Sequence, residues 1–249
     1  MNNLLEIKNL KKSYETKSGK VDAIENISLD VKEGEFIAIV GSSGCGKSTF
    51  LSILANLDKQ NSGTIKYNKK DIKVGYMLQE DALFDWLTIL DNSTLGLDIM
   101  KIKKEENINY VKKLLKTYGL NNFIDKYPNE LSGGMKQRVA LIRTLAINPD
   151  ILLLDEPFSA LDYQTRLAVS DDVYKIIKNE KKTVIMVTHD LAEAISLADK
   201  VIVLSKRPCR IKKIYDIKLT NKSTPIENRK AKEFADYYEK IWKELDVVI

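Results

Sequence analysis

Short apolar stretches separated by polar turns predict a strand-rich first third of the chain. The stretches expected to form strands are 4–10, 21–31, 35–40, 63–67 and 72–77. Apolar residues alternate with polar ones in 21–31, which we interpret as an edge strand. Residues 49–55 change to helical spacing directly after the strand 35–40. The pattern therefore predicts one helix that follows the third strand.

Helical spacing dominates from residue 81 to residue 149. Ile108, Val111 and Leu115 share one face of a predicted helix that Gly119 ends. Further helices are expected at 121–127 and 132–146. We interpret this part as a compact helical subdomain, about 81–149, inserted between two halves of an α/β core, about 1–80 and 150–220.

After residue 150 the pattern alternates again between strand and helix. The continuous apolar run Ile151–Leu154 is typical of a strand buried on both faces in a parallel sheet. Further strands are expected at 183–188 and 200–204, with helices at 162–179 and 191–198. An amphipathic C-terminal helix is predicted at about 225–246; it either folds back on the core or meets a membrane surface or a partner.

Glycines gather between the strand 35–40 and the helix 49–55. The residues there fit the pattern G-x-x-x-x-G-K-[ST], and they are Gly41, Ser42, Ser43, Gly44, Cys45, Gly46, Lys47, Ser48 and Thr49. In such a turn the backbone N–H groups and the positive end of the helix cradle phosphate oxygens. We expect Lys47 to reach the β- and γ-phosphates and Ser48 to hold Mg²⁺. The sequence therefore predicts a nucleotide-binding loop.

Polar side chains also follow three other predicted strands. Asp155 and Glu156 follow the strand 151–154, Gln79 follows 72–77, and His189, the only histidine, follows 183–188. We expect Asp155 to bind Mg²⁺ and Glu156 to take a proton from water that attacks the γ-phosphate. Gln79 is expected to ligate Mg²⁺ or orient that water, and His189 to contact the γ-phosphate. For Gln79 and His189 a purely structural role is the alternative.

A second anion site is predicted at the start of the helix 132–146. Ser132, Gly133 and Gly134 precede its apolar face, and a helix N-terminus of this composition favours negative charge. One nucleotide does not need two phosphate cradles. The second cradle is therefore expected to serve a nucleotide on another copy of the chain, in a head-to-tail dimer that encloses two ATP molecules.

Composition narrows the class of protein. The chain has 249 residues and a net charge of +5, and no apolar run approaches the ~20 residues that a membrane-spanning helix needs. The N-terminus lacks the pattern of a signal peptide, so we expect a soluble, cytoplasmic protein. Lysines are mixed with acids at 101–106 and 178–182, which predicts no nucleic-acid partner and leaves weak contact with anionic lipid open. Cys45 and Cys209 form no disulfide framework, and Cys45 is either sensitive to oxidation or simply a small residue that the loop tolerates.

In this order the motifs resemble those of the nucleotide-binding subunit of ATP-binding cassette (ABC) transporters, over essentially the whole chain. The resemblance implies an α/β P-loop NTPase with a RecA-like core, an N-terminal antiparallel β-subdomain and an inserted helical subdomain. It also implies that Tyr14 stacks on adenine and that Glu156 is the catalytic base, with His189 as the switch histidine. Residues 159–162 match the D-loop, so Asp162 joins Ser132–Gly134 at the ATP of the opposing subunit.

Two further segments resemble those of importers for nitrate, sulfonates and taurine. They are residues 83–92 and 206–211, although Asp85 stands where that branch usually has proline. The resemblance implies that Leu83, Phe84, Asp85 and Trp86 contact a transmembrane permease at the inner face of the membrane. A substrate-binding protein would be an indirect partner. Closure of the dimer on two Mg·ATP would then drive transport.

Other proteins share parts of this pattern. A non-transport ABC ATPase that acts in DNA repair inserts a long coiled coil between the phosphate loop and the signature, and no sustained heptads lie between Lys47 and Ser132. Translation factors of the family usually carry two cassettes in one chain. A stand-alone P-loop kinase or GTPase would not need the segment Leu131–Met135. The importer subunit is therefore the interpretation that uses every motif.

Overall fold

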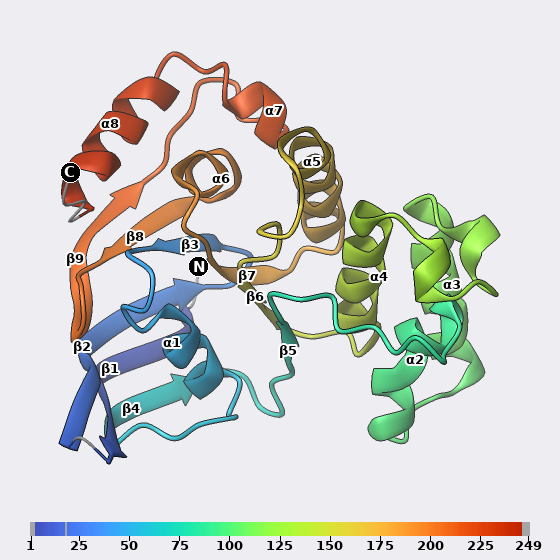
Figure 1. Cartoon of the computed structure of the whole chain (residues 1–249), viewed down its shortest axis with the longest axis horizontal. Helices are drawn as coiled ribbons and strands as arrows, with labels where there is room; N and C mark the ends of the chain where they lie inside the picture. The colour runs from blue at the N-terminus through green and yellow to red at the C-terminus, as the bar shows by residue number, and fades with distance from the viewer. Residues whose placement is uncertain (1–2, 18, 246–249) are drawn as a thin grey trace. The chain divides into compact units, whose positions relative to one another are not determined.

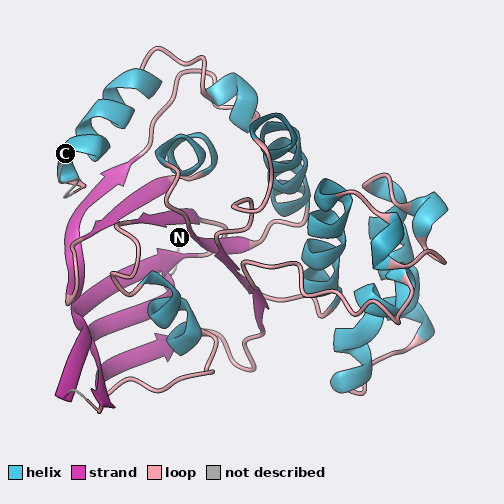
Figure 2. Ribbon diagram, in the orientation of Figure 1, coloured by secondary structure: helices cyan, strands magenta, loops and turns pink. Residues whose placement is uncertain are grey.

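The computed structural model describes residues 3–17 and 19–245, which form two compact units (Figure 1). The first unit consists of residues 1–72 and 182–249, and the second of residues 73–181. Residue 246, the predicted end of the C-terminal helix, lies outside the described residues. Figure 2 shows that strands and helices are mixed in the first unit, and the predicted α/β class is confirmed.

The first unit is built on a mixed sheet with the strand order β4-β1-β2-β9-β8-β3-β7. Its strands are β1 (Asn3–Thr16), β2 (Gly19–Lys32), β3 (Phe36–Val40), β4 (Ser62–Tyr67), β7 (Thr183–Val187), β8 (Lys200–Leu204) and β9 (Cys209–Asp216). β1 is antiparallel to β2 and β4, whereas β3 is parallel to β7 and β8. β9 joins the two halves, because it is parallel to β2 and antiparallel to β8.

Helices cover this sheet on both sides. They are α1 (Lys47–Leu54), α6 (Leu191–Leu197), α7 (Pro225–Asn228) and α8 (Phe234–Glu244). α1 lies against the concave side of the curved sheet (Figure 1). Its buried Phe50 meets apolar side chains of β2, β3, β8 and β9. α6 packs on β3 and is itself contacted by α7 and α8. α8 buries Ile241 and leaves Tyr238 and Trp242 stacked and exposed, so its apolar face is only partly covered.

The second unit combines two parallel strands with four helices. They are β5 (Val74–Met77), β6 (Ile151–Asp155), α2 (Ile89–Ile99), α3 (Glu105–Thr117), α4 (Gly133–Ala146) and α5 (Tyr163–Asn179), and short 3₁₀ turns lie at Asn121–Phe123 and Pro128–Glu130. α4 packs against α2, α3, α5 and β5. Its Val139, Ile142 and Leu145 are fully buried, because helices surround it on several sides. The helix that follows Ser132 is therefore the centre of this unit.

Two strand assignments needed correction. The prediction that 21–31 is an edge strand was wrong, because β2 lies between β1 and β9. An interior antiparallel strand with one solvated face alternates in the same way as an edge strand, so the pattern does not separate them. β9 was not predicted at all. Its exposed lysines, Lys212 and Lys213, hide the strand pattern in the sequence.

Three helix assignments were also corrected. The single C-terminal helix predicted at about 225–246 is divided into α7 and α8. The helix predicted at 121–127 is limited to a 3₁₀ turn, and the carbonyl oxygens of Ile124 and Lys126 instead accept N–H groups from the start of α2. Pro128 keeps the preceding residue extended, which also stops a helix there. α2 was not predicted, because the polar residues Asn92, Ser93 and Thr94 occupy buried positions in it.

Substitution of Gly63 tests how closely the backbones of β4 and β1 approach each other. An added Cβ would lie 2.5 Å from the carbonyl oxygen of Asn9 and 2.7 Å from the Cα of Leu10, at a φ of +92°. We expect Gly63→Ala to lower the free energy of unfolding by about 3 kcal/mol or more in urea denaturation. Gly34→Ala is the control, since Gly34 has a φ of +76° and no neighbour within 4 Å of the added atom. It should cost only about 1 kcal/mol of backbone strain, and equal losses in the two variants would contradict the close approach.

Candidate functional site

The glycine loop runs from the end of β3 into the first turn of α1. Gly44 and Gly46 have φ values of +69° and +128°, and a Cβ on Gly46 would lie 3.0 Å from both the Ala23 carbonyl oxygen and the Cys209 sulfur. Glycine is therefore required at Gly46. Within the described part of the chain, α1 begins without a side-chain cap and without an acid in its first turn. Its positive end consequently suits an anionic ligand.

Lys47 places a buried cation inside this loop. Lys47 is only 5% exposed, and its ammonium donates hydrogen bonds to the carbonyl oxygens of Gly41 (2.9 Å) and Ser42 (3.1 Å). These neutral carbonyls satisfy the donors without cancelling the charge. Together with the positive helix end, this arrangement fits the phosphates of a nucleotide. The exposed Ser48, in the first turn of α1, offers a hydroxyl oxygen of the kind that Mg²⁺ prefers.

Tyr14 presents one aromatic face in the first unit. The residue is 38% exposed; its hydroxyl donates a hydrogen bond to Asp58 at 2.7 Å, and the Lys12 ammonium lies 4.6 Å from the ring centroid. Burial, together with the bond to Asp58, raises the pKa of Tyr14. Because Lys12 covers one side of a ring that stays partly exposed, the geometry suits stacking of a planar group on the ring.

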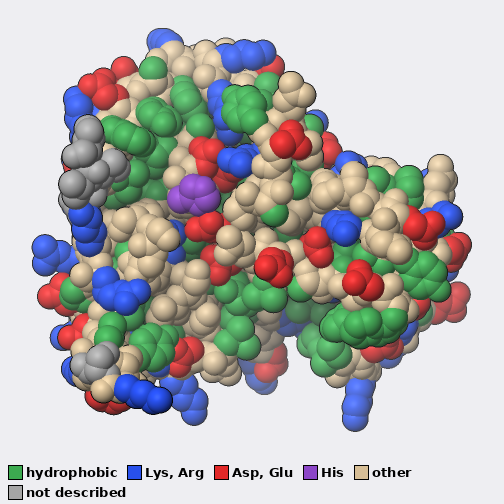
Figure 3. Space-filling view, in the orientation of Figure 1, with side chains coloured by type: hydrophobic (Ala, Val, Ile, Leu, Met, Phe, Trp, Pro, Cys, Tyr) green, Lys and Arg blue, Asp and Glu red, His purple; other side chains and the backbone are tan. Residues whose placement is uncertain are grey.

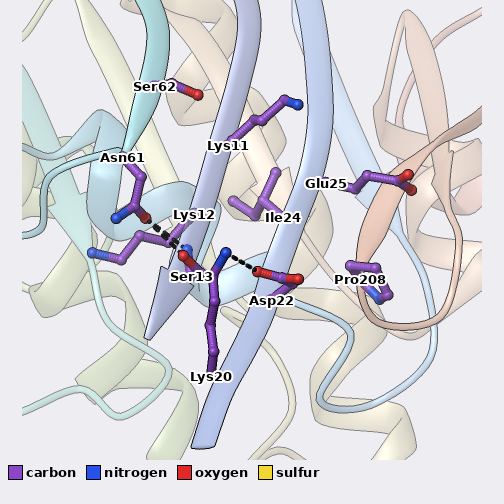
Figure 4. Close-up of a pocket in the computed structure, with 10 residues that line it drawn as sticks. All are labelled: Lys11, Lys12, Ser13, Lys20, Asp22, Ile24, Glu25, Asn61, Ser62 and Pro208. Atoms are coloured by element: carbon purple, nitrogen blue, oxygen red, sulfur yellow. Dashed lines mark hydrogen bonds and ion pairs between the residues drawn. The ribbon is translucent and has the colours of Figure 1, made fainter. Parts of the chain in front are cut away.

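A cavity of about 360 Å³ lies along β1 and β2, beside the residue before Tyr14 (Figure 4). Part of its polar lining is paired: Lys20 and Asp22 are 3.4 Å apart, and the N–H of Ser13 donates to the side-chain oxygen of Asn61 at 2.6 Å. Both signs of charge are present, and none of the loop residues Gly41–Thr49 lines the cavity. It is therefore not a site for the phosphates.

In the second unit, the two acids stand at the end of β6 as predicted. Asp155 is 6% exposed and accepts a hydrogen bond from the Tyr76 hydroxyl at 3.0 Å. Glu156 has a φ of +44°, a conformation that costs a residue with a side chain about 1 kcal/mol or more. Its carbonyl oxygen accepts the N–H and the hydroxyl of Ser159, which closes the turn. Strained backbone of this kind collects at functional sites.

Gln79 and His189 lie in different units. Gln79 is exposed, and its side-chain amide donates to the Ser159 hydroxyl at 3.4 Å, so the second unit brings Gln79 to the turn that carries Glu156. His189 lies in the first unit, between β7 and α6, and its side chain reaches the surface (purple in Figure 3). The next residue, Asp190, caps α6 by accepting the N–H groups of Ala192 and Glu193.

The segment before α4 contains both structural and accessible positions. Ser132 caps α4 by accepting the N–H of Met135 at 3.4 Å, and Ser132 and Gly133 are exposed. Gly134 is buried, and a Cβ there would lie 2.8 Å from a methyl group of Val169 on α5. Gly134 is therefore needed for helix packing, whereas Ser132 and Gly133 are available to a ligand.

Asp162 has an observed role as the cap of α5. Its carboxylate accepts the N–H groups of Gln164 and Thr165, both at 3.1 Å. Hydrogen bonds from the Thr165 side chain and backbone lower the pKa of Asp162. A capping carboxylate of this kind stabilises the helix start.

Residues 83–86, which are expected to meet a permease, form a loop with two aromatic side chains, called the aromatic loop below. Hydrogen bonds hold it on both sides. Trp86 is 73% exposed and Phe84 37% exposed, and their ring centroids are 4.9 Å apart. The fully buried Asn92 accepts the N–H of Phe84 and donates to the carbonyl oxygens of Phe84, Leu87 and Thr88. Arg143, on α4, donates to the carbonyl oxygens of Asp81 and Ala82.

Four residues that hold parts of the candidate site in place were not predicted from the sequence. They are Tyr76, Asn92, Arg143 and Arg207. Tyr76 and Arg143 act on groups distant in sequence, so no local pattern reveals them. Asn92 gives a weak signal, because it is a polar residue among apolar helix positions. Arg207 lies in the segment 206–211, but its contact with Gly44 spans most of the chain.

The described residues contain no group of three or more His, Cys, Asp and Glu side chains that could hold a metal ion by themselves. Mg²⁺ in nucleotide sites is instead bound by one or two protein oxygens, phosphates and water. The predicted ligands Ser48, Gln79 and Asp155 all offer oxygen atoms and fit that chemistry. None of the helices in residues 3–17 and 19–245 has the length and apolar character needed to cross a membrane.

Comparison with known proteins finds close similarity. A family model described as ABC transporter matches residues 24–159. An uncharacterized ABC transporter ATP-binding protein of Methanocaldococcus jannaschii is 45% identical, over 95% of this chain and 89% of the relative. The nitrate import ATP-binding protein NrtD of Synechocystis sp. is 39% identical, over 95% of this chain and 93% of the relative. The aliphatic sulfonates import ATP-binding protein SsuB of Bacillus cereus is also 39% identical, over 86% of each chain.

Among solved structures, the chain is similar to a dimeric post-hydrolysis state of the ATP-binding cassette MJ0796 bound to ADP and Pi. The TM-score is 0.73 and the identity 34%, and the match covers 86% of this chain and 99% of the solved one. The predicted P-loop NTPase fold is confirmed by this similarity.

The two cysteines provide a test of the loop's packing. Both are buried; burial raises the pKa of Cys45 and, with the nearby Cys45 thiol, raises the pKa of Cys209 to about 12. Only the thiolate reacts with alkylating agents, and at pH 8 both groups therefore remain thiols. We expect iodoacetamide at pH 8 to label the native protein at least about tenfold more slowly than the unfolded chain, as measured by mass spectrometry. Rapid labelling of native Cys45 would contradict its burial.

Proposed function

The chain belongs to the ATP-binding proteins of ABC transporters, and on that basis we propose that it drives an importer for nitrate, sulfonates, taurine or a related small solute. Proteins of this family are ATPases, so the chain is an ATPase. The observation that carries the proposal is the loop around the buried Lys47, in a chain that aligns over almost its full length with import proteins. A translation or repair function is not favoured by relatives whose names specify import.

We assign the nucleotide chemistry to the residues that the sequence motifs predict. The amides of Gly41–Thr49 and the Lys47 ammonium bind the β- and γ-phosphates, and Tyr14 stacks on adenine. Ser48, Gln79 and Asp155 would hold Mg²⁺, which neutralises charge on the phosphates when it is bound. Glu156 accepts a proton from the attacking water, and His189 contacts the γ-phosphate. Support for these roles comes from the oxygen donors, the strained turn at Glu156 and the order of the motifs.

We also propose that two copies close head-to-tail on two ATP molecules. Ser132 and Gly133 are exposed at the start of α4, where backbone N–H groups can meet a γ-phosphate of the partner copy. We assign Gly134 and Asp162 to the same contact with the ATP of the partner copy, in addition to their roles in packing and capping. The solved cassette to which this chain is similar is described as dimeric, which supports the proposal.

The aromatic loop is the proposed contact with transmembrane permease subunits. Leu83, Phe84, Asp85 and Trp86 would meet the permease at the inner face of the membrane, and a substrate-binding protein would supply the solute. The exposed Trp86 and Phe84 support this assignment, because large exposed aromatic side chains mark interaction sites. The bonds from Asn92 and Arg143 keep the loop in shape without a partner, which favours binding.

Substitution of the proposed base separates hydrolysis from dimerisation. We expect Glu156→Gln to lower ATP turnover at least about a hundredfold, because proton transfer from water is lost. The same variant should form dimers when ATP and Mg²⁺ are added, as measured by size-exclusion chromatography with light scattering. Lys47→Ala is the control, since it should lose ATP binding and remain monomeric. Undiminished hydrolysis by Glu156→Gln would exclude Glu156 as the base.

The permease contact can be tested by co-purification with a candidate transmembrane permease subunit of such an importer. We expect the double variant Phe84→Ala/Trp86→Ala to lose co-purification with that protein, while ATP hydrolysis by the isolated chain stays unchanged. Trp242→Ala removes the other exposed tryptophan and should co-purify normally. Loss of co-purification in the Trp242 variant alone would place the permease contact on α8 instead.

A further inference from the structure

An arginine outside the glycine motif holds the phosphate loop. Arg207 lies in the connection between β8 and β9, and its Nε and Nη2 atoms donate hydrogen bonds to one acceptor, the carbonyl oxygen of Gly44, at 3.1 and 2.6 Å. Ser43 and Gly44 are both exposed. The guanidinium therefore binds the loop at an accessible peptide group.

This contact orients an amide of the loop. The peptide bond between Gly44 and Cys45 is planar and trans, so the Gly44 carbonyl and the Cys45 N–H point in opposite directions. Arg207 holds the carbonyl from one side, and on the other side the Cys45 N–H donates a hydrogen bond to the carbonyl oxygen of Ser42, with 3.3 Å between nitrogen and oxygen. That side is also where Lys47 bonds to the Ser42 carbonyl. Arg207 consequently fixes the peptide group that closes the turn from Ser42 to Cys45.

The first residue of β9 restrains the loop at a second point. The sulfur of Cys209 lies 3.0 Å from where a Cβ of Gly46 would be, so it closes the space behind that glycine. Gly44 and Gly46 both have positive φ, and glycine has more freedom than any other residue to leave such a conformation. Contacts at Gly44 and Gly46 therefore restrict the loop to the conformation in which its amides face a ligand.

We propose that Arg207 is a positioning residue for ATP binding, which sets the shape of the phosphate loop before the nucleotide arrives. The proposal rests on the assignment of Gly41–Thr49 to the phosphates. A loop already in its binding shape loses less conformational entropy when the ligand binds, so its affinity is higher. Arg207 acts through Gly44 and not by taking part in hydrolysis.

Arg210 gives a matched control in the same segment. It lies three residues further on and is exposed, and its charged partner is Glu25 at 3.7 Å, away from the loop. We expect Arg207→Gln to raise the Kd and the KM for ATP roughly three- to tenfold, since two charge-assisted hydrogen bonds at an exposed site are lost. The kcat at saturating ATP and the melting temperature of the nucleotide-free protein should match those of the unmodified chain. Arg210→Gln removes the same charge and should bind ATP normally.

Hydrogen–deuterium exchange of the nucleotide-free protein measures directly how well the backbone amides of the loop are protected. A peptide that covers residues 42–49 should exchange faster in Arg207→Gln than in the unmodified chain or in Arg210→Gln. If Arg207→Gln fails to fold, Arg207→Lys replaces it under the same criteria, with a smaller effect because lysine cannot make both bonds.

Several results would overturn the proposal: unchanged ATP affinity and loop exchange in the Arg207 variant, equal losses in the two variants, or a loss in kcat alone. Equal losses would show an effect of overall charge. Failure of the unmodified chain to bind ATP would instead overturn the function assigned to the loop.

Discussion

The buried ammonium of Lys47 rests on two backbone carbonyl groups, and much of the first unit follows from that arrangement. The carbonyls of Gly41 and Ser42 must turn inward to meet it, so the chain reverses within a few residues of β3. Such a reversal needs positive φ at Gly44 and Gly46. Without a side chain on Gly46, the backbone of Ala23 and the sulfur of Cys209 can close around the loop. The position of the Lys47 ammonium thus depends on how β2 and β9 pack against the loop.

Much of the fold could be predicted from periodicity, because continuous apolar runs such as Ile151–Leu154 form only when both faces of a strand are covered. The same approach failed where polar residues are buried or exposed strands are charged. Asn92 is fully buried because its amide holds a loop, and this breaks the apolar stripe of α2. The lysines of β9 had the opposite effect, since a charged, half-exposed strand resembles a surface loop in sequence.

For the candidate site, spacing predicted where the polar groups stand but not what supports them. The positions of Asp155 and Glu156 at the end of β6 followed from the strand pattern, whereas the bond from Tyr76 and the positive φ of Glu156 did not. Both depend on how distant segments meet. Gly134 shows a further limit, because the same glycine that fits an anion site is required by the contact between α4 and α5. One position of a motif can therefore be required both for helix packing and for ligand binding.

The two tryptophans of the chain stand one in each unit, and both are exposed. Trp86 is a neighbour of Phe84, which does not absorb at the wavelengths used to excite tryptophan, whereas Trp242 stacks on Tyr238 with ring centroids 6.2 Å apart. Their surroundings thus give the two indoles distinct optical properties. Replacing either one with phenylalanine leaves a single tryptophan, and excitation at the long-wavelength edge, where tyrosine absorbs little, makes its emission report on one unit alone. Emission and quenching can then follow the two units separately during a cycle of nucleotide binding, without an attached dye.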